Sequence, residues 1–178
     1  MKKSNVRWIV RIVITSLVMS MVFTFASAEI LGNVGRAMAF VVLALFIALG
    51  VLFDILGVAA TTATPAPFHS MASHRERGAA EALWLLKNAE KVSSICNDVV
   101  GDISGIVSGD TAATIASGLM RDLHTEHILI QLMISGLVAA LTIGGKAVGK
   151  TYALKNSTAI LLRAGKLLNL KTRLFHKR

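Results

Sequence analysis

Four side chains between residues 94 and 102 could bind a hard cation. Ser94, Asn97, Asp98 and Asp102 supply hydroxyl, amide and carboxylate oxygens, which are the ligands that magnesium prefers in proteins. They lie in an apolar stretch, 92–119, that is long enough to cross a bilayer as a helix. Helical spacing puts residues 94, 98 and 102 on one face. Because carboxylates at membrane depth normally face a bundle interior or a wet cavity, the pattern predicts a cation or proton path.

A fifth candidate ligand, Asp54, lies near one end of another apolar stretch, 37–57. Its carboxylate could face water at the membrane surface. Alternatively, it could belong to the same polar interior as Asp98 and Asp102. The sequence supports both interpretations of Asp54.

The acidic helix also has a structural interpretation. In that case Asp98 lies at the membrane interface, and Asp102 pairs with a base such as Lys146 of a later apolar stretch. The glycines of this helix favour packing, since small residues at every fourth position let helix backbones approach closely in lipid. These packing glycines are Gly101, Gly105 and Gly109.

The composition is that of a membrane protein. Of the 178 residues, 54% are hydrophobic and 16% are charged, and mean hydropathy is +0.65. The formal net charge of +9 is attributed to topology and to contact with anionic lipid, and not to nucleic acid. No catalytic motif, metal-binding Cys/His spacing or phosphate-binding loop is present. We therefore expect neither an enzyme nor an organic cofactor.

The predicted fold is an all-α integral membrane protein of one domain, 1–178, with about four transmembrane helices. The first helix could instead be a cleaved signal peptide that ends at Ala26-Ser27-Ala28, although its length favours a retained helix. Prolines at 65 and 67, with Gly57, should end the second helix. The four predicted spans are 8–28, 37–57, 93–119 and 127–148.

Two further stretches should lie along the membrane surface. Residues 69–91 have apolar residues at helical spacing among charges, which predicts a juxtamembrane amphipathic helix. Residues 150–176 alternate leucines with bases, which predicts a basic amphipathic helix on an anionic surface. The basic residues expected to contact lipid are Lys155, Arg163, Lys166, Lys171 and Arg173.

Most Lys and Arg residues precede the first span, lie between the second and third, or follow the fourth. By the positive-inside rule, both termini and the 60–91 loop are therefore expected to be cytoplasmic. This arrangement requires an even number of spans, which also favours retention of the first helix. We expect a multi-pass protein of the cytoplasmic membrane.

Two segments resemble the membrane domain (DUF21-like) of the cyclin M and CorB/CorC magnesium transporter family. They are RGAAEALWLLKNAEKVSSI at 77–95 and GKAVGKTYALKNSTAILL at 145–162. The chain departs from the family at Asp54-Ile55-Leu56-Gly57, where a Ser-Gly-Ser-Glu motif is usual. It also has Lys146 and Gly149 where the family has glutamate and proline.

The resemblance implies a homodimer that binds a dehydrated magnesium ion. By this likeness Ser94, with Asn97 or Asp98, would contribute oxygen ligands. The paired nucleotide-sensing domains of the family do not follow in this sequence, so a separate cytoplasmic regulatory protein could be a partner. The lipid bilayer is the other expected partner.

The function expected is transport or efflux of a divalent cation, magnesium in particular, with magnesium as the substrate. A different class of function is a non-transporting membrane subunit that recruits a partner, and Lys146 favours it because a fixed cation repels another. A proton- or sodium-coupled carrier would use the same acids.

Overall fold

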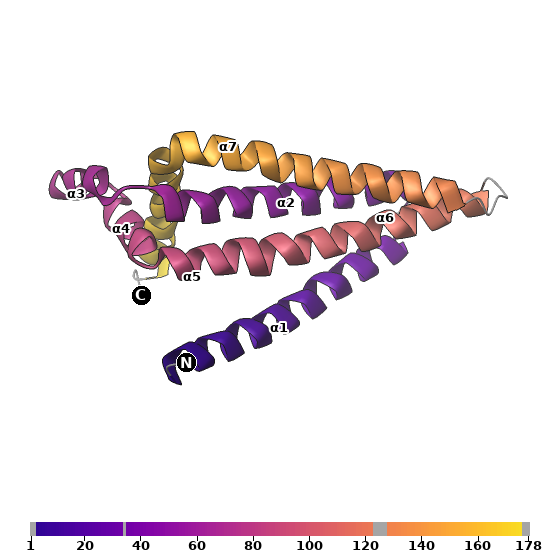
Figure 1. Cartoon of the computed structure of the whole chain (residues 1–178), viewed down its shortest axis with the longest axis horizontal. Helices are drawn as coiled ribbons and strands as arrows, with labels where there is room; N and C mark the ends of the chain where they lie inside the picture. The colour runs from indigo at the N-terminus through magenta and orange to yellow at the C-terminus, as the bar shows by residue number, and fades with distance from the viewer. Residues whose placement is uncertain (1–2, 34, 123–127, 176–178) are drawn as a thin grey trace.

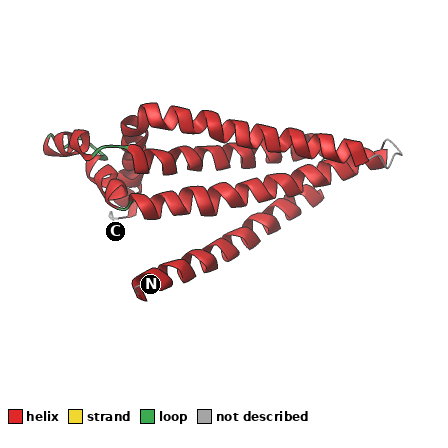
Figure 2. Ribbon diagram, viewed as in Figure 1, coloured by secondary structure: helices red, strands yellow, loops and turns green. Residues whose placement is uncertain are grey.

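The computed structural model describes residues 3–33, 35–122 and 128–175, and these are helical with short connections and no strand (Figure 2). This confirms the predicted all-α class. The helices extend beyond the predicted spans by one or two turns in places. They are α1 (Lys3–Asn33), α2 (Arg36–Thr62), α3 (Pro65–Ser73), α4 (Ala79–Lys87), α5 (Ala89–Ser93), the π-helix η1 (Ser94–Gly101), α6 (Asp102–Asp122) and α7 (Ile128–Phe175).

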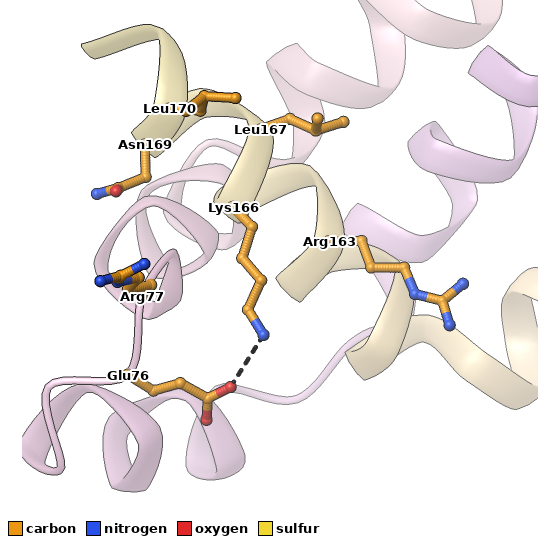
Figure 3. Close-up of a pocket in the computed structure, with 7 residues that line it drawn as sticks. All are labelled: Glu76, Arg77, Arg163, Lys166, Leu167, Asn169 and Leu170. Carbon is orange, nitrogen blue, oxygen red and sulfur yellow. Dashed lines mark hydrogen bonds and ion pairs between the residues drawn. The ribbon is translucent and has the colours of Figure 1, made fainter. Parts of the chain in front are cut away.

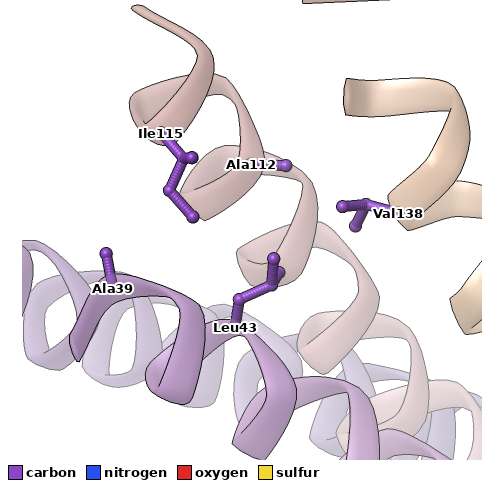
Figure 4. Packing of buried hydrophobic residues seen from close by; sticks show 5 residues of the cluster. All are labelled: Ala39, Leu43, Ala112, Ile115 and Val138. Carbon is purple, nitrogen blue, oxygen red and sulfur yellow. The ribbon is translucent and has the colours of Figure 1, made fainter. Parts of the chain in front are cut away.

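Three long helical runs form the bundle: α2, α7, and the continuous run of α5, η1 and α6 (Figure 1). Side chains from α2, α6 and α7 make one buried cluster in it, as Figure 4 shows. The C-terminal end of α1 lies close to α6, whereas the start of α1 diverges from the bundle. The buried cluster consists of Ala39, Leu43, Ala112, Ile115 and Val138.

Three helical segments are long and apolar enough to cross a membrane: Val6–Gly32, Ala37–Thr62 and Ile128–Leu170. Their outer surfaces carry many exposed large apolar side chains, as lipid contact requires. The run of η1 and α6 does not reach the same hydropathy, since aspartates, serines and glycines interrupt it. The predicted span at 93–119 therefore remains a prediction.

The start of α1, the helices α3 and α4, and the end of α7 lie at one end of the bundle (Figure 1). The end of α1, the start of α2, the end of α6 and the start of α7 lie at the other. This is the arrangement expected if both termini and the 60–91 loop share one side.

The second helix ends at Thr62, in the predicted proline segment, and continues through Gly57, the other predicted breaker. Gly57 is buried and in helical conformation, so its missing side chain serves packing rather than termination. The break follows at Ala63 and Thr64, whose backbones are extended, and Pro65 occupies the start of α3. This is the conformation that a proline imposes on the residue before it.

The predicted single helix at 69–91 is wrong, because a turn at 74–78 separates α3 from α4 and a second break, at Asn88, separates α4 from α5. Arg75 (φ 56°) and Gly78 (φ 84°) both adopt left-handed backbone conformations in this turn. A side chain at Gly78 would also collide with the backbone of Lys166. The turn folds α3 and α4 over a small core of Ala60, Phe68, Ala82, Leu85 and Leu161.

Helix α7 is kinked at Asn156, whose backbone is not helical (φ −123°, ψ 22°). Beyond the kink, α7 turns across the end of the bundle and packs against α4 (Figure 1). Its fully buried Leu161 lies in the core with Phe68, so one apolar face of the predicted surface helix is covered by protein. Leu154, Leu167 and Leu170 stay exposed.

Candidate functional site

A face of small and polar residues on α2 meets η1 and the start of α6. Gly50, Asp54 and Gly57 lie on one face of α2 by helical spacing. Because the two glycines have no Cβ, the backbone of α2 can approach η1 and α6 closely at these positions. A Cβ at Gly50 would lie 3.2 Å from that of Ser104, and one at Gly57 would overlap the Asn97 amide. The two helices therefore run in opposite directions, with Asp54 between the two contacts along α2.

Asp54 is buried on this face, with 3% of its surface exposed. This decides between the two interpretations of its position: the carboxylate belongs to the interior. Its Oδ2 lies 3.9 Å from Nζ of Lys150 on α7 and accepts no hydrogen bond. A buried carboxylate with one long ion pair is only partly compensated for its loss of hydration.

Asn97 lies in the π-helix, a rare form that occurs frequently at functional sites. Its Nδ2 donates a hydrogen bond to Oγ of Ser93 (3.2 Å), while its buried Oδ1 has no partner. Gly101 allows this wide turn, since a Cβ there would lie 3.2 Å from the carbonyl oxygen of Cys96. The amide oxygen is thus held against Gly57 of α2.

Three buried side-chain oxygens of the described residues lack a hydrogen-bond partner, and all three come from α2 or from the η1–α6 run that packs against it. They are Oδ2 of Asp54, Oδ1 of Asn97 and Oγ of Ser104. Burying a polar atom without a hydrogen-bond partner costs free energy, because the atom loses its contacts with water. A bound ion or an ordered water molecule would supply the missing partner. Carboxylate, amide and hydroxyl oxygens suit a hard cation. Within the described residues, no group of three His, Cys, Asp or Glu side chains could hold a metal, so backbone or water ligands would be needed.

Asp102 lies outside this interface. Its carboxylate is 67% exposed, and its Oδ1 is 3.2 Å from Nζ of Lys146. This is the structural pair considered as an alternative from the sequence. Lys146 is four residues before Lys150, so one face of α7 presents an ammonium group to each of the two acids, Asp102 and Asp54.

The predicted common cavity for Ser94, Asp98 and Asp102 is not found in the described residues. Ser94 is half-buried and Asp98 is exposed. Asp102 lines a groove of about 460 Å³ between α6 and α7, which neither Ser94 nor Asp98 lines. The reason is that the run of η1 and α6 turns its Val99, Ile103 and Val107 face inward, toward α1 and α2.

The three packing glycines have different surroundings. Gly101 is buried against α2 and approaches Lys146, as close packing requires. Gly105 and Gly109 instead line the open groove between α6 and α7, and no heavy atom lies within 4 Å of a Cβ built on either. Close packing within the chain is therefore made at Gly101 alone of the three.

The predicted lipid-facing bases lie along α7. Lys155 and Arg163 are exposed, and Lys166 pairs with Glu76 at 3.2 Å. Arg163 and Lys166 border a pocket of about 720 Å³ between α7 and the turn before α4 (Figure 3). Lys171 and Arg173 lie in the helical backbone of α7, but their side chains fall outside the described part.

The sequence interpretation missed Lys150, Gly57 and Ser104 as parts of this site. Spacing was the available signal. Lys150 is one turn from Lys146, and Gly50 and Gly57 flank Asp54 at helical intervals.

Comparisons of the chain with protein-family models, with curated proteins and with solved structures gave no match.

Proposed function

We propose that this protein transports a hard divalent cation, magnesium in particular, across the membrane as its substrate. One observation carries the proposal: buried oxygens of Asp54 on α2, and of Asn97 and Ser104 on the run packed against it, lack hydrogen-bond partners. Helix α2, and α7, which packs against α2, are apolar enough to span a membrane. Asn97 and Ser104 are seven residues apart on one helical run, about 10 Å, so a cation would meet their oxygens in succession, with the Asp54 carboxylate between them.

Lys150 would act as a tethered competitor for that cation. Its ammonium is 3.9 Å from Asp54, and its side chain is 53% exposed. A long, flexible side chain of this kind can withdraw its charge to water when another cation approaches. Binding would then exchange one positive charge for another beside a buried carboxylate.

The resemblance to the cyclin M and CorB/CorC family supports magnesium as the substrate and a homodimer as the active form. The open groove with Gly105 and Gly109 offers small residues that a second membrane helix could approach. Placement in the cytoplasmic membrane with both termini inside, and a separate cytoplasmic regulatory protein, belong to the same proposal.

A second candidate function is a non-transporting membrane subunit. The observation in its favour is the 3.2 Å pair between Lys146 and Asp102, which leaves one acid of the predicted path neutralised. A proton- or sodium-coupled carrier would rely on Asp54 in the same way as magnesium transport does.

The test is magnesium flux into proteoliposomes loaded with a magnesium-sensitive dye. Asp54→Asn should reduce the flux at least tenfold, because it removes the buried negative charge while keeping the size of the side chain. Asp110→Asn is the matched control, since Asp110 is an exposed acid farther along α6. Asn97→Leu should also reduce flux by removing the free amide oxygen.

Magnesium binding to the detergent-purified protein, measured by calorimetry, separates the candidates. Flux and binding that both depend on Asp54 support transport. Folded wild-type protein that neither binds nor passes magnesium contradicts it and favours the subunit. Flux that requires a sodium or proton gradient and ignores magnesium favours the carrier.

A further inference from the structure

A cluster of cationic side chains lies between the start of α1 and α5, away from the α2 interface. Arg7 and Arg11 are one helical turn apart on α1. Together with Trp8 and Lys91 they line a pocket of about 220 Å³. None of the four lining residues is acidic. Nζ of Lys91 lies 5.6 Å from the centroid of the Trp8 ring.

Three positive charges around one small pocket repel one another. The contact of Lys91 with the Trp8 ring offsets part of this cost, since the ring face attracts a cation. An anion in the pocket would compensate all three charges together. Arginine side chains suit phosphate in particular, because the guanidinium group can donate two parallel hydrogen bonds to its oxygens.

The place of the cluster indicates the source of such an anion. Trp8 lies in the first turns of the apolar segment Val6–Gly32, and tryptophan is enriched at membrane–water interfaces. The start of α1 is at the same end of the bundle as α3 and α4, where the helices leave the apolar layer (Figure 1). At this depth the abundant anionic group is the phosphate of a phospholipid.

We propose that Arg7, Arg11 and Lys91 bind the headgroup of an anionic phospholipid, with Trp8 beside it. The lipid joins α1 to α5 at the end where α1 diverges from the bundle (Figure 1). It thereby fixes the first helix against the π-helical segment that follows α5.

Quenching of Trp8 fluorescence by brominated lipid tests the proposal. Trp84→Phe leaves Trp8 as the one tryptophan of the chain, which has two. In phosphatidylcholine bilayers, brominated phosphatidylglycerol should quench Trp8 at a far lower mole fraction than brominated phosphatidylcholine. Each basic residue near an anionic surface contributes about fivefold, so Arg7→Gln with Arg11→Gln should weaken this preference about 25-fold.

Arg77→Gln with Lys87→Gln is the matched control, because it removes two exposed charges beside α4, at the same end of the bundle. The control should keep the preference, and circular dichroism should give the same helix content for all variants. Equal quenching of the parent by both lipids overturns the proposal. So does an equal loss in the control pair, which would indicate general attraction. Relief of quenching by millimolar inorganic phosphate would assign the pocket to free phosphate instead.

Discussion

The ammonium group of Lys146 lies 3.2 Å from Oδ1 of Asp102 and joins α7 to α6. Lys146 is mostly buried, whereas Asp102 is 67% exposed on the outer side of the bundle. A carboxylate on the outer side of a membrane helix is stabilised by such a partner. The pair therefore neutralises one of the acids that the sequence made candidates for a cation path.

Lys146→Met should lower the free energy of unfolding by about 1 kcal/mol, because it leaves the Asp102 carboxylate without this ion pair. The double variant Lys146→Met with Asp102→Asn should regain most of that loss. Thermal unfolding in detergent of these two variants, of Asp102→Asn alone and of the parent completes a double-mutant cycle. A purely additive cycle would mean that the two side chains do not interact in the membrane protein.

Gly57→Ala should destabilise the protein by about 1–3 kcal/mol, because the added methyl group overlaps the Asn97 amide. Gly118→Ala is the matched control, since Gly118 lies in α6 and a Cβ there meets no heavy atom within 4 Å. The control should be neutral, or more stable by about 0.5–1 kcal/mol through helix propensity. The midpoint of thermal unfolding distinguishes them, and equal midpoints would contradict the close contact of α2 with the π-helix.

The long apolar helices and the proline-marked break after α2 could be predicted from hydropathy and backbone chemistry. The partner of Asp102 could also be anticipated, because few bases lie in the apolar stretches. The burial of Asp54 could not be decided, since a carboxylate near a helix end has two acceptable environments.

The π-helix could not be predicted from the spacing of apolar residues. It differs from an α-helix in its backbone hydrogen bonds, which join residues five apart, and one short π-helical stretch leaves the apolar pattern unchanged. Its presence changes which side chains face α2 and brings Asn97 to Gly57 while Asp98 stays exposed. The turn at Arg75 was missed for a similar reason: left-handed backbone at a non-glycine residue depends on the surrounding packing.

Helix α1 is held to α6 by a buried contact between Oγ of Ser27 and Oγ1 of Thr111, 3.3 Å apart. In a Cys96→Ala background, Ser27→Cys with Thr111→Cys should therefore form an intramolecular disulfide under mild oxidation. Non-reducing electrophoresis detects it, with Ser27→Cys alone as the control. If a peptidase removed residues 1–28, reduction would release a short fragment, and the intact mass would identify it. A single chain of full mass is the expected result.

The run of η1 and α6 should cross the membrane despite its modest hydropathy. Arg121, near the end of α6, and Gly35, between α1 and α2, are exposed at one end of the bundle, whereas His74 is exposed at the other. In a Cys96→Ala background, Arg121→Cys and Gly35→Cys should react with a membrane-impermeant maleimide from the same side of sealed vesicles. His74→Cys should react from the opposite side. Labelling of Arg121→Cys from the same side as His74→Cys would contradict this prediction. It would mean that the run of η1 and α6 does not cross the membrane, which leaves three spans.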